Sequence, residues 1–218
     1  MALSFPLSTA EFANLLRPIS STFSVGEAVE NNETAGGEII AASYGPRLWQ
    51  GSMQVTTESP DDYEQAVARA ELLNQAGASF MFRSLARSGP IADPTGSILG
   101  AAVPQITNVN ANMRDITISS LPVGYVITRG DYLSFTYLSS PTRYAFHRVV
   151  TGGTANGGGV AGSIELTPAI RSGYTTPFNV DLIRPGLKAV MIPNTFRPGT
   201  YSRWNVDGFS FSWRQTLR

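Results

Sequence analysis

The sequence contains no cysteine and a single histidine. The first absence excludes disulfide bonds, thiolate catalysis and cysteine-ligated zinc, and it leaves the redox compartment open. Metal sites usually combine several histidine, cysteine or carboxylate ligands, and here the acidic residues are scattered. We therefore expect neither a metal site nor a cofactor.

Charge is also scarce, at 15% of the 218 residues, where about 25% is typical of globular proteins. Sixteen basic and sixteen acidic residues give a formal net charge of zero, and they are interspersed. Because nucleic-acid binding relies on clustered basic residues, we expect no recognition of a nucleic-acid sequence. All basic residues but Lys188 are arginines, which favours pairing at packed interfaces over a solvated lysine surface.

Long apolar runs are missing as well. No stretch approaches the roughly 18 apolar residues of a membrane-spanning helix, so this chain is not expected to insert into a membrane. The N-terminal residues have no basic segment and no apolar run, and so do not resemble a secretory signal.

Short strands are what the sequence favours instead. Hydrophobic residues make up 42%, and 21 glycines and 14 prolines separate short apolar or alternating runs. The stretch Gly130–Arg171 organises the chain: its runs at 130–135, 143–150 and 162–171 predict three antiparallel strands. A single hairpin is marginal in water, so these strands need further partners.

The remaining runs predict strands on both sides of this stretch. In residues 47–57, Trp49, Gly51, Met53 and Val55 share one face. The polar residues 30–37 and the Gly-, Pro- and Ser-rich residues 86–101 predict loops. Further strands are expected at 19–29, 38–44, 80–85, 103–109, 115–121, 178–183, 187–192 and 209–214.

One convincing helix is predicted at 60–76. Ser59 suits the N-cap, Pro60 suits the first helical position, and Asp61 and Asp62 favour the positive end of the dipole. Its apolar stripe is rich in alanine, and Gly77 suits the end. The stripe comprises Tyr63, Ala66, Val67, Ala70, Leu73 and Ala76. Ser8 and Glu11 also have the spacing of a capping box, for one or two helical turns.

These elements predict a mainly β fold, a β-sandwich main domain with one packed α-helix and a small inserted β-barrel-like subdomain. We expect the last strand, with Phe209, Phe211 and Trp213 inward, to return to the first sheet. The expected domains are residues 1–119 plus 172–218, forming a discontinuous main domain, and residues 120–171, forming the small one.

The candidate chemical groups all have ordinary structural explanations. His147 lies in a predicted strand and is expected to be a half-buried sheet residue, and no nucleophile elbow accompanies it. Asp61 and Asp62 are explained by the helix start. A carboxylate pair for glycoside hydrolysis stays open, although the spacing of the available acids is generic. Those acids are Glu38, Glu58, Asp131 and Glu165. We predict no catalytic residue and no enzyme activity.

A glycine run and the three tryptophans also have ordinary structural explanations. Gly157-Gly158-Gly159 lies between two strands and lacks the form of a phosphate-binding loop, so a hairpin connection is expected. Trp49, Trp204 and Trp213 could form a sugar-binding platform, but such residues more often belong to the core, and we expect them there; Trp204 lies in a predicted loop.

The order of four landmarks resembles that of the distal tail proteins, found at the tail tip of long-tailed phages. The resemblance covers about residues 46–171 and lies in order and spacing, since no single motif is specific. The landmarks are Pro46-Arg47-Leu48-Trp49, the helix 60–76 with Phe80-Met81-Phe82, the pair of segments 129–135 and 143–150, and residues 162–171.

This resemblance implies a structural virion component of the tail-tip baseplate in a siphophage, assembled in the host cytoplasm. It implies a homohexameric ring joining the tail tube protein to the baseplate hub protein. A β-sandwich with a packed helix would form the ring, and a smaller β domain would project outward. The family has no catalytic motif to carry over, and the interface residues are not implied.

Other functions remain open on the sequence alone. A tube or terminator protein of the tail would also form rings. A carbohydrate-binding β-sandwich for host adhesion is motivated by the aromatic residues, and a glycosidase or peptidase has the least support.

Overall fold

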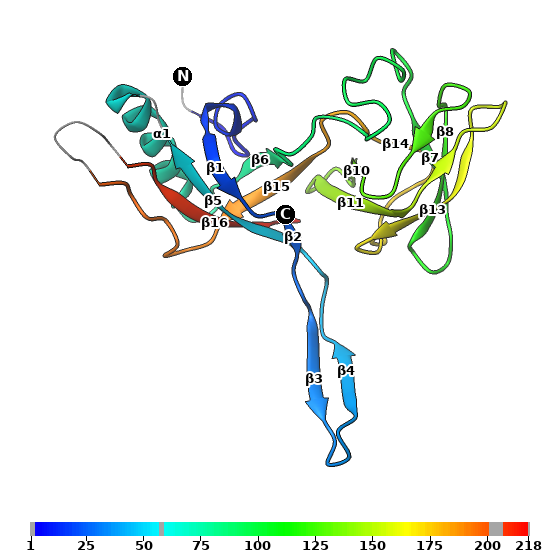
Figure 1. The fold of residues 1–218 in the computed structure, drawn as a ribbon, viewed down its shortest axis with the longest axis horizontal. Helices are drawn as coiled ribbons and strands as arrows, with labels where there is room; N and C mark the ends of the chain where they lie inside the picture. The colour runs from blue at the N-terminus through cyan, green and yellow to red at the C-terminus, as the bar shows by residue number, and fades with distance from the viewer. Residues whose placement is uncertain (1–2, 57–58, 201–206, 218) are drawn as a thin grey trace.

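The computed structural model describes residues 3–56, 59–200 and 207–217, and within them the fold is mainly β with one α-helix (Figure 1). The first sheet has the strand order β1-β5-β16-β15-β6, and β2 also pairs with β5. Its strands are β1 (Arg17–Ser21), β2 (Ser24–Val25), β5 (Trp49–Thr56), β6 (Phe80–Arg83), β15 (Gly186–Met191) and β16 (Ser210–Gln215). The expected mainly β fold is confirmed.

Alternation in sequence decides which side of this sheet is buried. Trp49, Met53 and Val55 of β5 are buried, as predicted. The C-terminal strand β16 pairs antiparallel with β5, and Phe209, Phe211 and Trp213 enter the same core. The expected return of the last strand to the first sheet is therefore confirmed, and residues from both ends of the chain share this core.

Helix α1 (Pro60–Leu73) covers this core with its alanine-rich face. The Ser59 hydroxyl accepts a hydrogen bond from the Asp62 N–H (3.1 Å), which confirms the predicted cap. The helix ends at Leu73, three residues before the predicted end, and Asn74 is its C-cap. Gly77, at φ +84°, turns the chain after this end, and Ala76 is exposed there.

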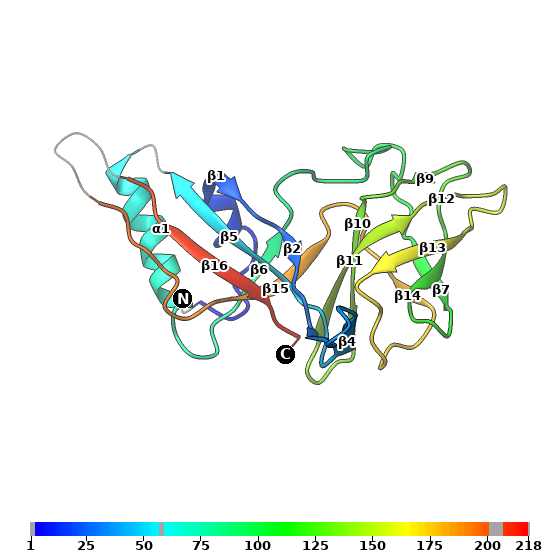
Figure 2. The ribbon, with the colours of Figure 1, turned by 60° about the horizontal axis from the view of Figure 1, so that its bottom comes forward.

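The second sheet has the order β10-β11-β13-β8-β7-β14. It curls into a nearly closed barrel, because Ser134 of β10 exchanges backbone hydrogen bonds of 3.0 and 2.8 Å with Asp181, just after β14. Its strands are β7 (Gln105–Val109), β8 (Asp115–Ser119), β10 (Tyr132–Tyr137), β11 (Arg143–Thr151), β13 (Ala161–Thr167) and β14 (Phe178–Asn179). A short pair, β9 (Val126–Ile127) with β12 (Gly153–Thr154), lies beside it (Figure 2).

The three strands predicted within 130–171 are confirmed as the consecutive antiparallel neighbours β10, β11 and β13. The barrel nevertheless takes in more of the chain than the expected 120–171. Its hydrophobic core extends from Leu99 to Leu182, so β7, β8 and β14 belong to it and not to the first sheet. Those strands have the same apolar alternation as the others, and only pairing assigns them to a sheet.

The predicted loop at 30–37 is partly wrong. β3 (Val29–Glu33) and β4 (Ile39–Ser43) form a separate two-stranded hairpin around a turn at Thr34–Glu38, and Figure 1 shows it extending away from both sheets. Near the N-terminus, Ser8 and Glu11 form the predicted capping box, and the helical turn that follows it is the 3₁₀ turn η1 (Ala13–Leu15) and not an α-helix. The strand predicted at 178–183 is shorter in the structure, where β14 comprises Phe178–Asn179.

The two sheets meet through β10 and β11, while α1 lies at the opposite end of the first sheet (Figures 1 and 2). Phe146 of β11 belongs to the core of the first sheet, whereas its neighbours Ala145 and Val149 belong to the barrel core. One strand therefore contributes to both cores, which ties the two units together.

Candidate functional site

His147 is buried more completely than predicted, with 4% of its surface exposed. Its ring stacks on Phe135 at 5.5 Å, and Nδ1 lies 2.7 Å from the Pro168 carbonyl oxygen. Because a carbonyl oxygen only accepts, Nδ1 carries the proton and donates it, which leaves Nε2 as an acceptor. Burial lowers the pKa of His147 to about 4, so the ring is neutral near pH 7.

The surroundings of both ring nitrogens of His147 differ from those of the histidine in a catalytic triad. The position that an orienting carboxylate would occupy at Nδ1 is taken by the Pro168 carbonyl group. Nε2, which would take a proton from a nucleophile, is buried and has no hydrogen-bond partner among the described residues. His147 is therefore placed as a buried strand residue.

A small pocket borders His147. Its volume is about 20 Å³, and a cavity needs about 10–15 Å³ to hold one water molecule. The pocket accommodates a water molecule and is too small for a sugar or a nucleotide. Its lining includes Arg47, Tyr137, Phe146, Arg171 and Gln215, with no acidic residue among the described ones.

A wider hollow of about 670 Å³ lies at the C-terminal end of α1. It is bordered by Leu73, by the residues that follow the helix, and by Val190 and Met191 of β15. Lys188 is the charged residue in its described lining, which contains no carboxylate or histidine that could act as a general base beside it.

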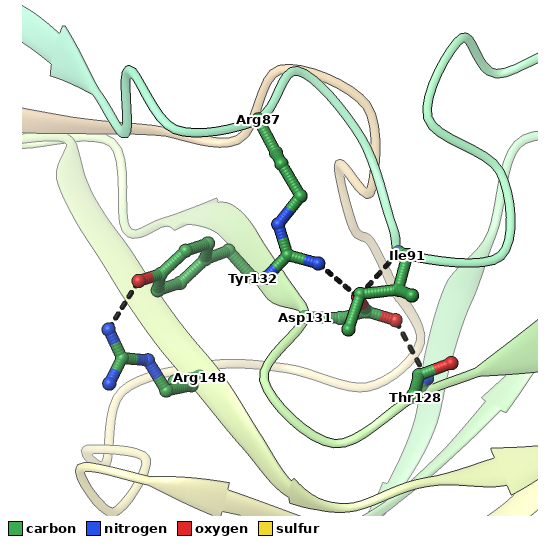
Figure 3. A network of polar contacts seen from close by, with 6 residues as sticks. All are labelled: Arg87, Ile91, Thr128, Asp131, Tyr132 and Arg148. Atoms are coloured by element: carbon green, nitrogen blue, oxygen red, sulfur yellow. Dashed lines mark hydrogen bonds and ion pairs between the residues drawn. The ribbon is translucent and has the colours of Figure 1, made fainter.

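Asp131, one of the four acids considered for hydrolysis, is buried and anchors a loop. Its carboxylate accepts hydrogen bonds of 2.7 Å from the N–H groups of Ile91 and Thr128, and Arg87 lies at 4.0 Å (Figure 3). Ile91 belongs to the loop 86–101 that links the sheets. Because the Asp131 carboxylate accepts a hydrogen bond from the Ile91 N–H, it attaches the loop 86–101 to the barrel.

Asp93 fastens the same loop internally, a role that the sequence analysis missed. Burial by itself would raise the pKa of Asp93, but hydrogen bonds from the N–H groups of Leu99 and Ile98 and from the Tyr125 hydroxyl outweigh it and lower the pKa. Burial of the Tyr125 hydroxyl group, together with the negative charge of Asp93, raises the pKa of Tyr125. The Asp93-Pro94 sequence indicated only a turn.

Neither Glu38 nor Glu165 is brought together with Asp131. Glu38 lies at the tip of the β3–β4 hairpin, and Glu165 on β13 accepts a hydrogen bond from Thr151. Glu58 lies outside the described residues. Asp61 and Asp62 occupy the first turn of α1, as predicted. Within the described ranges, no group of three histidine, cysteine or acidic residues has the arrangement of a metal site.

Trp49 and Trp213 are both 0% exposed, which confirms the prediction that they belong to the core. They cannot form a sugar-binding platform, and Trp204 lies outside the described residues. Gly157–Gly159 lie in the segment that connects the antiparallel neighbours β11 and β13, where the Asn156 side chain accepts from the N–H groups of Gly158 and Val160. The predicted hairpin connection is confirmed.

An aromatic junction holds the two sheets against each other. The Trp49 indole N–H donates to the Phe146 carbonyl oxygen at 2.8 Å, and the Phe23 ring contacts both of these side chains. The Arg148 guanidinium lies 5.2 Å from the Trp49 ring centroid and 4.9 Å from that of Tyr132. Figure 3 shows its hydrogen bond to the Tyr132 hydroxyl. Cation–π and aromatic contacts of this kind stabilise packing.

The β3–β4 hairpin, which we call the arm (residues 29–43), packs on neither sheet in the described part of the chain. All ten of its strand residues are exposed, and neither hydrophobic core includes any residue of the arm. Ile39 and Ile40 are 69% and 57% exposed, and Tyr44 at its base is 72% exposed. Isolated two-stranded hairpins are at best marginally stable, so contact with another surface would stabilise the arm.

The sequence pattern gives only a weak indication of the arm. β3 reads Val-Glu-Asn-Asn-Glu, which has no apolar alternation and poor intrinsic strand preference. The available signal was the Gly36-Gly37 pair before the predicted strand at 38–44, which is typical of a hairpin turn. Gly37 adopts φ +81° there, a conformation that favours glycine.

Comparison with known proteins adds no assignment, since no family model matches the chain and no curated protein is significantly similar to it. No helix in the described part of the chain is long and apolar enough to span a bilayer.

Proposed function

We propose that this protein is a structural component of a phage tail tip, a distal tail protein that forms a homohexameric ring between the tail tube and the baseplate hub. The observation that carries the proposal is the arm, which projects from two packed β units and presents apolar side chains without a partner. The ordered landmarks that resemble the distal tail family support this choice of assembly.

The architecture supports an assembly role in a second way. The first sheet ends at β1 on one side and at β6 on the other, where Leu7 forms a parallel bridge with Phe80, so the open edge is that of β1. Ile19 on β1 is 64% exposed, and Pro18 in the same strand lacks the N–H that a central strand would use. Neighbouring copies commonly cover such edges in symmetric oligomers.

The chemistry of the buried polar groups agrees with a structural role. His147 donates to a backbone carbonyl group, Asp131 accepts from two backbone N–H groups, and Asp93 accepts from two more. These groups satisfy backbone atoms and fix loops. The proposed function therefore assigns them to the scaffold and assigns no reaction to the chain.

Light scattering after size-exclusion chromatography, followed by negative-stain imaging, tests the proposal. A hexamer of 23.4-kDa subunits has a mass of about 140 kDa and should be visible as a ring. A chain that stays monomeric at high concentration, and that is missing from the tail tip of purified virions, would contradict it. Locating the subunit in the virion separates a distal tail protein from a tube or terminator protein.

A further inference from the structure

The small pocket beside His147 lies between the two β units, and we call it the junction pocket. Arg47, just before β5, and Gln215 of β16 line it from the side of the first sheet. Tyr137 of β10 and Arg171, which follows β13, line it from the side of the barrel. A ligand in this pocket would therefore contact both units.

Positive charge is concentrated at the junction pocket. Arg47 and Arg171 line it, and Arg143 lies opposite the lining residue Tyr137 in the β10–β11 ladder. Burial lowers the pKa of Arg171, and the positive charge of Arg143 lowers it further. No described carboxylate lines the pocket or forms an ion pair with any of the three arginines. Like charges that are partly buried repel each other, so an anion among them would be strongly attracted.

Two buried nitrogen atoms in this region have no hydrogen-bond partner among the described residues. They are Nε of Arg143, which is a donor, and Nε2 of His147, whose side chain is almost fully buried. The Gln215 amide is already used, because it accepts from the Trp49 N–H at 3.3 Å and donates to the Tyr144 carbonyl oxygen at 3.2 Å. Buried groups without a partner are costly, and hydrogen bonds from a guanidinium group to an anion are strong.

The size of the junction pocket limits the ligand to one small ion. Its volume of about 20 Å³ exceeds the roughly 10–15 Å³ that one water molecule requires. A halide ion is only slightly larger than a water molecule and fits such a space, whereas sulfate, a phosphate ester or a sugar acid does not. The basic lining selects for negative charge, and the volume selects for a single atom.

We propose that the junction pocket binds one chloride-sized anion, which Arg47 and Arg171 hold between the two β units. The anion offsets the repulsion between Arg143 and Arg171 and joins a residue beside the first sheet to one beside the barrel. Bound anion therefore stabilises the junction. This inference concerns the two units of one subunit, so it does not depend on the proposed ring.

His147 couples this site to pH. Its Nδ1–H donates to the Pro168 carbonyl oxygen, so an added proton goes to Nε2 and converts that atom from an acceptor into a donor. A bound anion favours the protonated ring, whereas the charges of Arg47 and Arg171 oppose it, and Tyr137 is the other titratable residue of the lining. Chloride should therefore bind more tightly as the pH falls and His147 takes up a proton.

Thermal unfolding in chloride is the first test. Sodium chloride replaces sodium gluconate, whose anion is too large for the pocket, at constant ionic strength, so that screening is unchanged. For one site, the melting temperature should be about 3–6 °C higher at a chloride concentration of ten times the Kd. Light scattering in both salts keeps a change of assembly from being mistaken for binding. A melting temperature that does not respond to chloride would overturn the proposal.

Substitutions separate the site from a general salt effect. Arg171→Gln should weaken chloride binding at least about tenfold, since it removes a charged donor, and Arg171→Lys should restore part of the loss. Arg197→Gln is the matched control, because Arg197 is exposed and does not line the pocket, and its chloride response should equal that of the wild type. Should Arg171→Gln prevent folding, Arg47→Gln changes an exposed side chain and takes its place. Equal chloride responses in the pocket variants and in Arg197→Gln would overturn the proposal.

The pH dependence of binding tests the part assigned to His147. The chloride Kd should be lower at pH 4.5 than at pH 7.5 in the wild type, and His147→Gln should remove this difference. A Kd that does not fall with pH in the wild type would overturn the coupling to His147.

Bromide locates the site directly. Crystals of the wild-type protein soaked in sodium bromide should give an anomalous scattering peak in the junction pocket, next to Arg47 and Arg171. Bromide peaks only elsewhere on the molecule would overturn the proposal and leave the proposed ring untouched.

Discussion

Replacing Trp49 by phenylalanine tests the junction between the two sheets. The change removes the indole N–H that donates to the Phe146 carbonyl oxygen at 2.8 Å, in a side chain that is 0% exposed. A buried polar group left without its partner costs about 1–3 kcal/mol, in addition to the cavity that the smaller ring creates. The weaker attraction of phenylalanine for Arg148 adds up to about 1 kcal/mol.

Trp213→Phe is the matched control for this variant. Trp213 is equally buried and packs in the same core, but its Nε1 has no hydrogen-bond partner among the described residues. Both substitutions remove the same atoms, so their cavity costs are similar. Trp49→Phe should therefore lower the free energy of unfolding by about 1–3 kcal/mol more than Trp213→Phe does.

Urea unfolding followed by far-ultraviolet circular dichroism measures this difference without depending on tryptophan fluorescence. For a chain of this size, 1 kcal/mol corresponds to about 2–4 °C in melting temperature, so thermal scans give a second reading. If Trp213→Phe destabilises as much as or more than Trp49→Phe, the hydrogen bond to Phe146 does not hold the junction and the reasoning is refuted.

Three further substitutions follow from the structure. Ser59→Ala removes the cap of α1 and should cost about 1 kcal/mol in urea unfolding, whereas Ser59→Asp should largely preserve stability. Asp131→Asn places an amide N–H₂ group against backbone N–H donors, so limited proteolysis should cut the loop 86–101 at least about tenfold faster, and an unchanged rate would show that Asp131 does not anchor it. His147 has its pKa lowered to about 4, below the ordinary value of 6.5, so the unfolded chain binds a proton that the folded chain does not. Stability should therefore fall as pH decreases from 6.5 to 4, by up to about 3 kcal/mol, and His147→Gln should abolish the part of this dependence that titrates in that window.

Local sequence was enough to predict the elements whose signals are short-range. The cap and start of α1 depend on residues within one helical turn, and the buried faces of β5 and β16 depend on alternation within each strand. These features would be recognised in any fold that contains such segments. The same local reasoning placed Trp49 and Trp213 in the core.

Only the tertiary structure decided which strands share a sheet. The runs at 105–109 and 115–119 alternate like those of the first sheet, and pairing with β13 assigns them to the barrel. The loop 86–101 was predicted, but its attachment through Asp93 and Asp131 joins residues up to 40 positions apart. Such contacts leave no local pattern, because the backbone N–H groups they satisfy are present in every residue other than proline.

The arm illustrates the difference between what the sequence determined and what only the tertiary structure decided. Composition by itself determined that this chain is poor in charge and contains no cysteine, and the short alternating runs predicted many strands. Whether residues 29–33 form a loop or a strand was decided by hydrogen bonds to residues 39–43 across a turn. The free energy of a strand comes from its neighbours, so a polar segment such as β3 becomes a strand only when the fold provides a partner.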